Sequence, residues 1–123
     1  MKFSLPIKAL SVNAAYRGRR FNTKEKIRFD RALALMLPSG RVPGEWYRLT
    51  YDFDLVNFSR TDTQNLLKPL TDCIVRRGII IDDRRIVVEI VRKHPAKKDR
   101  ITVEIDGIDR PAERTLSRMG AAI

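Results

Sequence analysis

An alternating stretch between residues 45 and 58 constrains the fold of this chain more than any other feature. Apolar side chains stand at every second position from Tyr47 to Leu55, and polar or charged side chains fill the positions between them. Successive side chains of an extended strand point to opposite faces, so the stretch predicts a β-strand with one buried and one solvated face. Such a strand needs a second layer of structure over its apolar face.

Two amphipathic runs predict the helices of that second layer. The first helix is expected over residues 23–37, because Thr23 is a good N-cap. The second is expected to start near Asn65 or Leu66, because Pro69 lacks an N–H and fits best in a helix's first turn. It runs to Arg77 and closes at Gly78, whose freedom to take a positive φ suits a helix C-terminus.

The remaining segments predict strands and a loop. Residues 3–8 alternate as a first strand, and Pro6 places it at a sheet edge. Residues 11–22 lack periodicity and are expected to form a loop. Residues 84–94 and 100–106 both alternate, and residues 95–99 between them indicate the turn of a hairpin.

Together these elements predict a small single α/β domain, with a mixed sheet of about four strands and two main helices packed on it. We expect the domain to span residues 1–108, and residues 109–123 to form a polar, basic tail. A chain of 123 residues is long enough for one core but not for two.

Charge and composition narrow the class of partner. The chain carries 25 Lys and Arg against 15 Asp and Glu, and much of the positive excess lies in residues 2–31. Such a balance favours polyanions, most often nucleic acid. The absence of a long apolar run indicates no membrane span, and a single cysteine indicates a reducing, cytoplasmic setting. One Cys and one His argue against a zinc site made by the protein alone.

Polar groups that could hold a metal gather in residues 58–83. Asp62 and Gln64 lie at one end, Lys68 follows, and the doublet Asp82-Asp83 comes after the predicted helix. A helix that starts beside one carboxylate and returns by a turn to two more would bring hard oxygen ligands together, which suits Mg²⁺ or Mn²⁺. The alternative is a capped surface helix followed by an acidic turn.

The same stretch resembles the signature of the RusA family of Holliday-junction resolvases. DTQNLLKPLTD followed by GIIIDD is similar to the family's D-x-D-N-L-x-K, a helix, and a hydrophobic stretch ending in D-D. Upstream, Ser11, Asn13 and Tyr16 followed by Gly18-Arg19-Arg20 resemble the family's S-x-N-x-x-Y and basic G-R segment. The resemblance covers roughly residues 3 to 106.

The resemblance implies a metal-dependent homodimer that nicks two strands of four-way junction DNA symmetrically, in recombination and repair. It implies Mg²⁺, with Mn²⁺ as an alternative, held by Asp62 and Asp83 with Asp82 adjacent, and Lys68 as the essential lysine at the phosphate. It also implies a bacterial or phage-infected cell, and a phage or prophage origin.

Residues for DNA binding are expected in the basic N-terminal part. Aromatic and basic side chains alternate there, a mixture that suits contacts to distorted DNA. An ordinary solvated loop would show the same mixture, and Asn13 could equally stabilise the loop. The candidate residues are Asn13, Tyr16, Arg17, Arg19, Arg20, Lys24 and, in the central motif, Lys68.

One position departs from the family's pattern, since Gln64 stands where the family has its second aspartate. An amide oxygen can coordinate a metal but carries no charge, so Mg²⁺ binding would weaken unless Asp52 or Asp54 compensates. Three hypotheses therefore stay open. The protein is an active junction endonuclease, a relative that binds branched DNA without cutting it, or a basic RNA-binding protein with an incidental acidic motif.

Overall fold

The computed structural model describes residues 1–17 and 21–115; Gly18, Arg19 and Arg20 and residues 116–123 lie outside this description. The described chain forms these elements in order: β1 (Lys2–Leu5), α1 (Val12–Ala15), β2 (Tyr16–Arg17), β3 (Phe21–Asn22), α2 (Lys24–Met36), β4 (Trp46–Leu55), η1 (Phe58–Arg60), α3 (Gln64–Arg77), η2 (Asp83–Arg85), β5 (Ile86–Pro95) and β6 (Arg100–Ile108). Residues 109–115 of the expected tail have no regular secondary structure.

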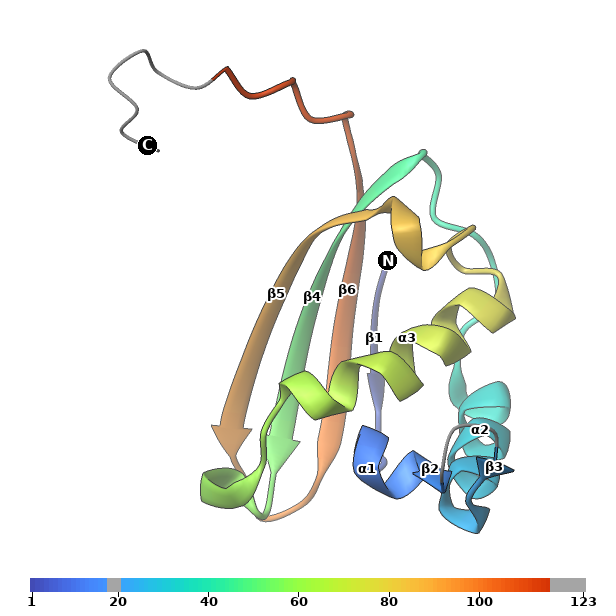
Figure 1. The fold of residues 1–123 in the computed structure, drawn as a ribbon, viewed down its shortest axis with the longest axis vertical. Coiled ribbons are helices and arrows are strands. Elements are labelled where there is room, and N and C mark those ends of the chain that lie inside the picture. Colours follow the sequence, from blue (N-terminus) through green and yellow to red (C-terminus); the bar gives the residue numbers. More distant parts are fainter. Residues whose placement is uncertain (18–20, 116–123) are drawn as a thin grey trace.

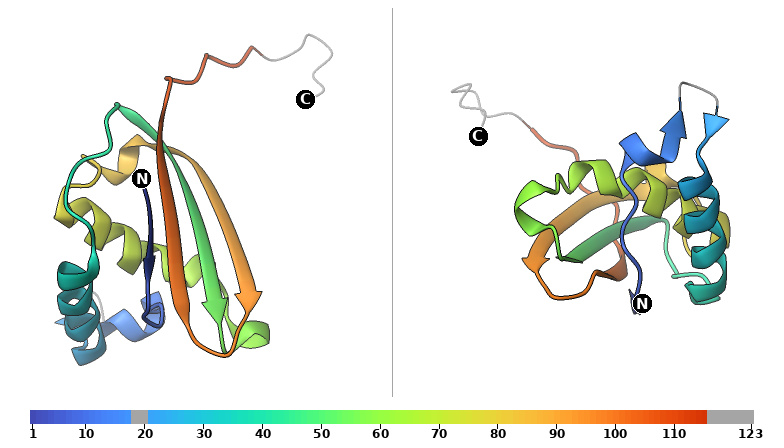
Figure 2. Two further views of the ribbon diagram at one scale, coloured as in Figure 1. Left: turned by 180° about the vertical axis from the view of Figure 1, so that it is seen from behind. Right: turned by 90° about the horizontal axis from the view of Figure 1, so that it is seen from below.

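The main sheet has four strands in the order β1-β6-β4-β5. β5 runs parallel to β4, while β6 is antiparallel to both β4 and β1. The helices lie on one face of this sheet and leave its other face open (Figures 1 and 2). The predicted fold class, a small α/β domain with a mixed four-stranded sheet and two long helices, is confirmed.

The predicted hairpin of the last two strands is wrong. β5 and β6 do not pair with each other, because β4 lies between them and pairs with both. The connecting turn crosses the carboxyl end of β4, where the Ala96 N–H donates to the carbonyl of Leu55 and Asp99 accepts from the Val56 N–H. β4 therefore occupies the interior of the sheet, which suits the strand whose alternate side chains are the most completely buried.

The alternation that predicted β4 is confirmed. Its buried face carries Tyr47, Leu49, Tyr51, Phe53 and Leu55, each at most 5% exposed, while its open face is only partly covered. Helices α2 and α3 cover the buried face with apolar side chains at helical spacing. The helical contribution to the core consists of Phe29, Leu33, Leu66, Leu70, Cys73 and Ile74.

The segment expected to be a loop contains regular structure. Ser11 caps α1 by accepting from the Asn13 N–H, and Tyr16–Arg17 pairs with Phe21–Asn22 as a short antiparallel ribbon. Thr23 then caps α2, as predicted, by accepting from the Lys26 N–H. The short elements were not predicted because four-residue helices and two-residue strands leave no periodic pattern in a sequence.

Helix α3 starts earlier than predicted, at Gln64, so Pro69 lies inside the helix rather than in its first turn. Pro69 is buried, and burial of its apolar ring acts against the cost of the missing N–H donor. At the other end Gly78 takes the left-handed conformation with φ 84°, as predicted. None of the helices in the described residues is long and apolar enough to cross a membrane.

Candidate active site

One face of α3 carries the polar residues of the central motif. Gln64, Lys68 and Asp72 follow each other at intervals of four, which places them on the same side of the helix. The ammonium nitrogen of Lys68 lies 3.3 Å from Oδ2 of Asp72, the ion pair expected from this spacing. Attraction to Asp72 raises the pKa of Lys68, and Tyr16 and Asp83 add to the effect, so the side chain is charged at neutral pH.

Asp62 stands just before Thr63, the N-cap of α3, and its side chain binds the first N–H of the helix. Its Oδ1 accepts a hydrogen bond of 3.0 Å from the Gln64 N–H, and its carbonyl accepts from the Asn65 N–H. The side chain is exposed. Capping fixes one oxygen near the helix N-terminus, where the helix dipole favours negative charge, and leaves the other oxygen facing solvent.

The backbone just before Asp62 is held by a residue of β5. The ammonium of Lys93 donates to the carbonyls of Phe58, at 2.9 Å, and Thr61, at 3.3 Å. It also lies 4.6 Å from the centre of the Phe58 ring, within range of a cation–π contact. Sequence reasoning missed Lys93, because its position follows only from the parallel pairing of β5 with β4.

The acidic doublet divides into two unlike side chains. Asp82 caps η2 and accepts three hydrogen bonds from Arg84: one from its backbone N–H and two from its guanidinium. These bonds hold the pKa of Asp82 well below its usual range. Asp83 is exposed, begins η2 and is near enough to Lys68 to influence its pKa. Asp83 is therefore the less engaged carboxylate of the two.

Tyr16, from the upstream motif, also reaches this region. α1 packs against α3, and Tyr16 adds to the rise in the pKa of Lys68. The tyrosine ring lies 5.8 Å from the ammonium of Lys26, a buried lysine that forms an ion pair with Asp30. Asp30 also accepts from the thiol of Cys73 at 3.3 Å, so a buried polar network joins α2 to α3 behind Tyr16.

Three other predicted DNA-binding residues lie in the N-terminal elements of the chain. Asn13 in α1 and Lys24 at the start of α2 are exposed, and Arg17 belongs to β2. Arg19 and Arg20 lie outside the described residues.

The donor set fits a hard cation by chemistry, since Asp62, Gln64, Asp82 and Asp83 all offer oxygen. Residues 1–17 and 21–115 nevertheless contain no group of three or more His, Cys, Asp and Glu side chains arranged to hold a metal ion. The structure therefore brings Asp83 toward Lys68 but does not unite Asp62, Asp82 and Asp83 in one cluster.

The two aspartates proposed to compensate for Gln64 lie elsewhere. Asp52 and Asp54 alternate with the buried residues of β4 and so face the open side of the sheet, away from α3. Asp52 is also bound there by Arg92, through bonds of 2.9 and 3.1 Å, and by His94 at 2.8 Å. The hypothesis that these carboxylates compensate for Gln64 is wrong for this arrangement.

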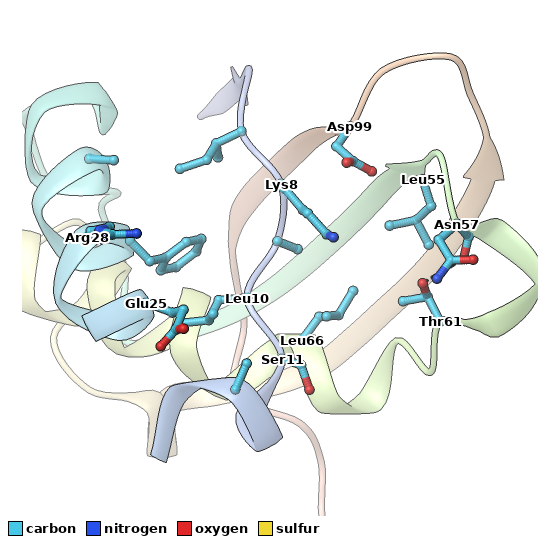
Figure 3. A pocket seen from close by; sticks show the side chains of 15 residues that line it. Lys8, Leu10, Ser11, Glu25, Arg28, Leu55, Asn57, Thr61, Leu66 and Asp99 are labelled. Carbon is cyan, nitrogen blue, oxygen red and sulfur yellow. Dashed lines mark hydrogen bonds between the residues drawn. The ribbon is translucent and has the colours of Figure 1, made fainter. Parts of the chain in front are cut away.

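A cavity of about 600 Å³ opens next to the start of α3 (Figure 3). Its walls come from the segment between β1 and α1, from α2, and from the chain between β4 and α3. Leu10, Phe29, Leu55 and Leu66 give it an apolar lining, and Thr61, the neighbour of Asp62, lies at its edge. Sequence reasoning missed this cavity, because its lining residues are far apart along the chain.

Comparison with known families connects these features. A family model described as endodeoxyribonuclease RusA matches residues 11–106. The matched range holds the upstream residues from Ser11 to Tyr16, the segment from Asp62 to Lys68, and the doublet at 82 and 83. A search of curated proteins found no match.

Proposed function

Because this chain belongs to the RusA family of endodeoxyribonucleases, we propose that it is a Mg²⁺-dependent enzyme that resolves four-way DNA junctions. In this proposal a homodimer nicks two strands symmetrically during recombination and repair. Family membership supports a resolvase-like endonuclease and argues against an RNA-binding protein with an incidental acidic motif, since the match includes both halves of that motif.

The observation that carries the proposal is the meeting of three distant segments at Lys68. Tyr16 comes from the upstream motif, Lys68 from α3 and Asp83 from the segment after α3, and Asp72 first, then Tyr16 and Asp83, raise the pKa of Lys68. A lysine that is charged, exposed and flanked by a carboxylate is suited to hold a phosphate near a metal-binding group.

In this proposal each residue of the candidate site has a separate role. Asp62, Gln64 and Asp83 would hold Mg²⁺ or Mn²⁺, with Asp82 in a smaller role because Arg84 already occupies its oxygens. When bound, such an ion lowers the pKa of water and shields charge that develops on the scissile phosphate. Lys68 would bind a non-bridging phosphate oxygen and keep the phosphodiester beside Asp83.

Capping gives Asp62 a defined position for this role. The hydrogen bond from the Gln64 N–H fixes one oxygen, and Lys93 fixes the backbone on the other side. A ligand held in this way loses little conformational freedom on binding, which favours affinity for the ion.

Junction binding would rest on the basic N-terminal region. Asn13 and Lys24 are exposed beside α1 and α2, and the net charge of +10 favours phosphate contacts. We expect affinity for a four-way junction to exceed affinity for a duplex and to fall steeply with salt, because each phosphate contact releases counterions. Lys24→Ala should reduce the slope of log affinity against log salt by roughly one.

The deciding experiment is Gln64→Asp. If Gln64 belongs to the metal shell, the added anion should lower the Mg²⁺ concentration that gives half-maximal nicking of a synthetic junction. Asp83→Asn should abolish nicking in either background while junction binding persists, and Lys68→Ala should reduce nicking with little change in Mg²⁺ dependence. Equal Mg²⁺ dependence of wild type and Gln64→Asp would remove Gln64 from the metal shell.

A second candidate function is the binding of branched DNA without cleavage. Gln64 in place of a carboxylate, and the lack of a three-carboxylate cluster in the described residues, both favour it. Tight junction binding by wild type and by Gln64→Asp, with no nicking by either at saturating Mg²⁺ or Mn²⁺, would establish this function instead.

A further inference from the structure

The strand β5 forms one edge of the main sheet (Figure 1). The opposite edge, β1, has four residues and is followed by Pro6, two features that discourage further pairing. β5 has 10 residues, and its one proline, Pro95, is the last of them. A long edge without these protections is a template for another strand.

The side chains of β5 make that edge apolar on the open face. Val88 and Ile90 pair with Arg48 and Thr50 of β4, so they point to the face that no helix covers. Each is 39% exposed, and the neighbouring Val87 is exposed to the same extent. Apolar groups left open along an unpaired strand indicate a surface that another strand covers.

We propose that β5 pairs antiparallel with β5 of a second copy of this chain, around a two-fold axis at Ile90. The pairing would join two four-stranded sheets into one continuous sheet. It assigns a surface to the homodimer of the proposed function and in that respect rests on it.

The charges along β5 favour the antiparallel direction. A parallel pairing in register would set Glu89, Arg92 and Lys93 against their own copies, and like charges opposite each other are destabilising. The antiparallel direction about Ile90 instead sets Glu89 opposite Val91 and Arg92 opposite Val88, so no two like charges face each other directly.

The apolar residues fix the position of the axis. With the axis at Glu89, two carboxylates would face each other. With the axis at Val91, Ile90 would face Arg92 and the apolar residues would be separated. With the axis at Ile90, that residue faces its own copy and Val88 lies diagonal to it, so the two Ile90 side chains cover each other while Val88 faces Arg92.

The proposed interface also touches the candidate active site through one residue. Lys93 lies on β5 and holds the carbonyls of Phe58 and Thr61 just before Asp62. The strand that joins the two copies therefore also fixes the backbone that leads into each candidate site.

The test measures association without DNA or metal. Light scattering after size exclusion, over a dilution series, should show the wild type passing from dimer to monomer, as expected for a small strand-mediated interface. Ile90→Glu and Ile90→Lys should each raise the dimer dissociation constant at least about tenfold, because like charges then face each other at the axis. Leu35→Glu, on the 89% exposed Leu35 of α2, is the control and should change nothing.

Mixing the two variants makes the test specific for the axis. An equimolar mixture of Ile90→Glu and Ile90→Lys should recover the dimer that neither forms alone, since Glu then faces Lys. A wild type that stays monomeric at every concentration, or a mixture that fails to recover the dimer, would overturn the proposal.

Disulfide trapping gives a second measurement that does not weaken the interface. Ile90→Cys should cross-link to itself under mild oxidation, and a mixture of Val88→Cys with Arg92→Cys should form the mixed dimer. Cys73, the native cysteine, should not cross-link, because burial raises the pKa of its thiol to about 12. If the control Leu35→Cys cross-links as readily as Ile90→Cys, the assigned surface is refuted. Since no nicking is measured, a wild type that stays monomeric would remove the homodimer but not the proposed endonuclease activity. Loss of nicking alone would leave this interface standing.

Discussion

The hydrogen bond between Tyr51 and Thr71 should couple the sheet to the helix that carries Lys68. The two hydroxyl oxygens lie 2.9 Å apart, and both residues are buried between β4 and α3. Burial raises the pKa of Tyr51, so the hydroxyl stays neutral and can donate at any physiological pH. The bond therefore fixes the middle of α3, one residue from Asp72.

Removing either partner leaves a buried hydroxyl without its hydrogen bond. Tyr51→Phe and Thr71→Val should each lower the free energy of unfolding by about 1–3 kcal/mol. The double variant should cost less than the sum of the two, because removing both partners leaves no unsatisfied group, and the coupling energy should be about 1 kcal/mol or more.

Urea unfolding followed by the fluorescence of Trp46, the single tryptophan, gives the three free energies. Ser4 and Thr102 supply the control cycle, because their hydroxyls are also 2.9 Å apart but exposed, so coupling there should be close to zero. Additive effects at Tyr51 and Thr71, within about 0.5 kcal/mol, would refute the reasoning. If α3 is held by this bond, junction nicking should also fall in each single variant more than in the Ser4 control.

Three further outcomes follow from the structure. Gly107→Ala should lower the free energy of unfolding by about 1–3 kcal/mol in thermal or urea unfolding, because an added Cβ would lie 2.4 Å from the backbone oxygen of Pro43. Asp52→Asn should lower the free energy of unfolding at neutral pH and flatten its decrease below about pH 4. Hydrogen bonds from Arg92, and then from His94, lower the pKa of Asp52. The stability that the carboxylate contributes is therefore present above its unfolded pKa and is lost as pH falls through its folded pKa. Lys93→Met should reduce nicking more than it reduces the melting temperature, since it frees the backbone before Asp62; equal activity at equal metal concentration would count against a positioning role.

Local signals in the sequence predicted the elements well. The alternation from Tyr47 to Leu55, the cap at Thr23 and the left-handed Gly78 each depend on a few neighbouring residues, and the structure confirms all three. The ion pair of Lys68 with Asp72 is local in the same way, since the two residues are four positions apart on α3.

What the sequence could not predict depends on contacts between distant segments. Two alternating runs joined by a short turn usually make a hairpin, but here the turn crosses the end of β4, and only the full sheet shows that. The start of α3 was misplaced because burial of Pro69 outweighs its missing donor. In the site, the bonds that Arg84 makes with Asp82 and the reach of Lys93 to Thr61 had no sequence signature.

The strand order has a consequence for how this protein folds. β1 pairs only with β6 in the main sheet, and β4 needs β6 on one side and β5 on the other. β1, the first strand of the chain, can therefore pair only after β6, the last strand, is present. The central strand β4 needs both β5 and β6, which follow it in the chain. Long-range pairing of this kind slows folding and makes it all-or-none. A fragment that ends after α3 would contain Asp62 and Lys68 but no completed sheet beneath them, so we expect the candidate site to form only in the chain that includes β6.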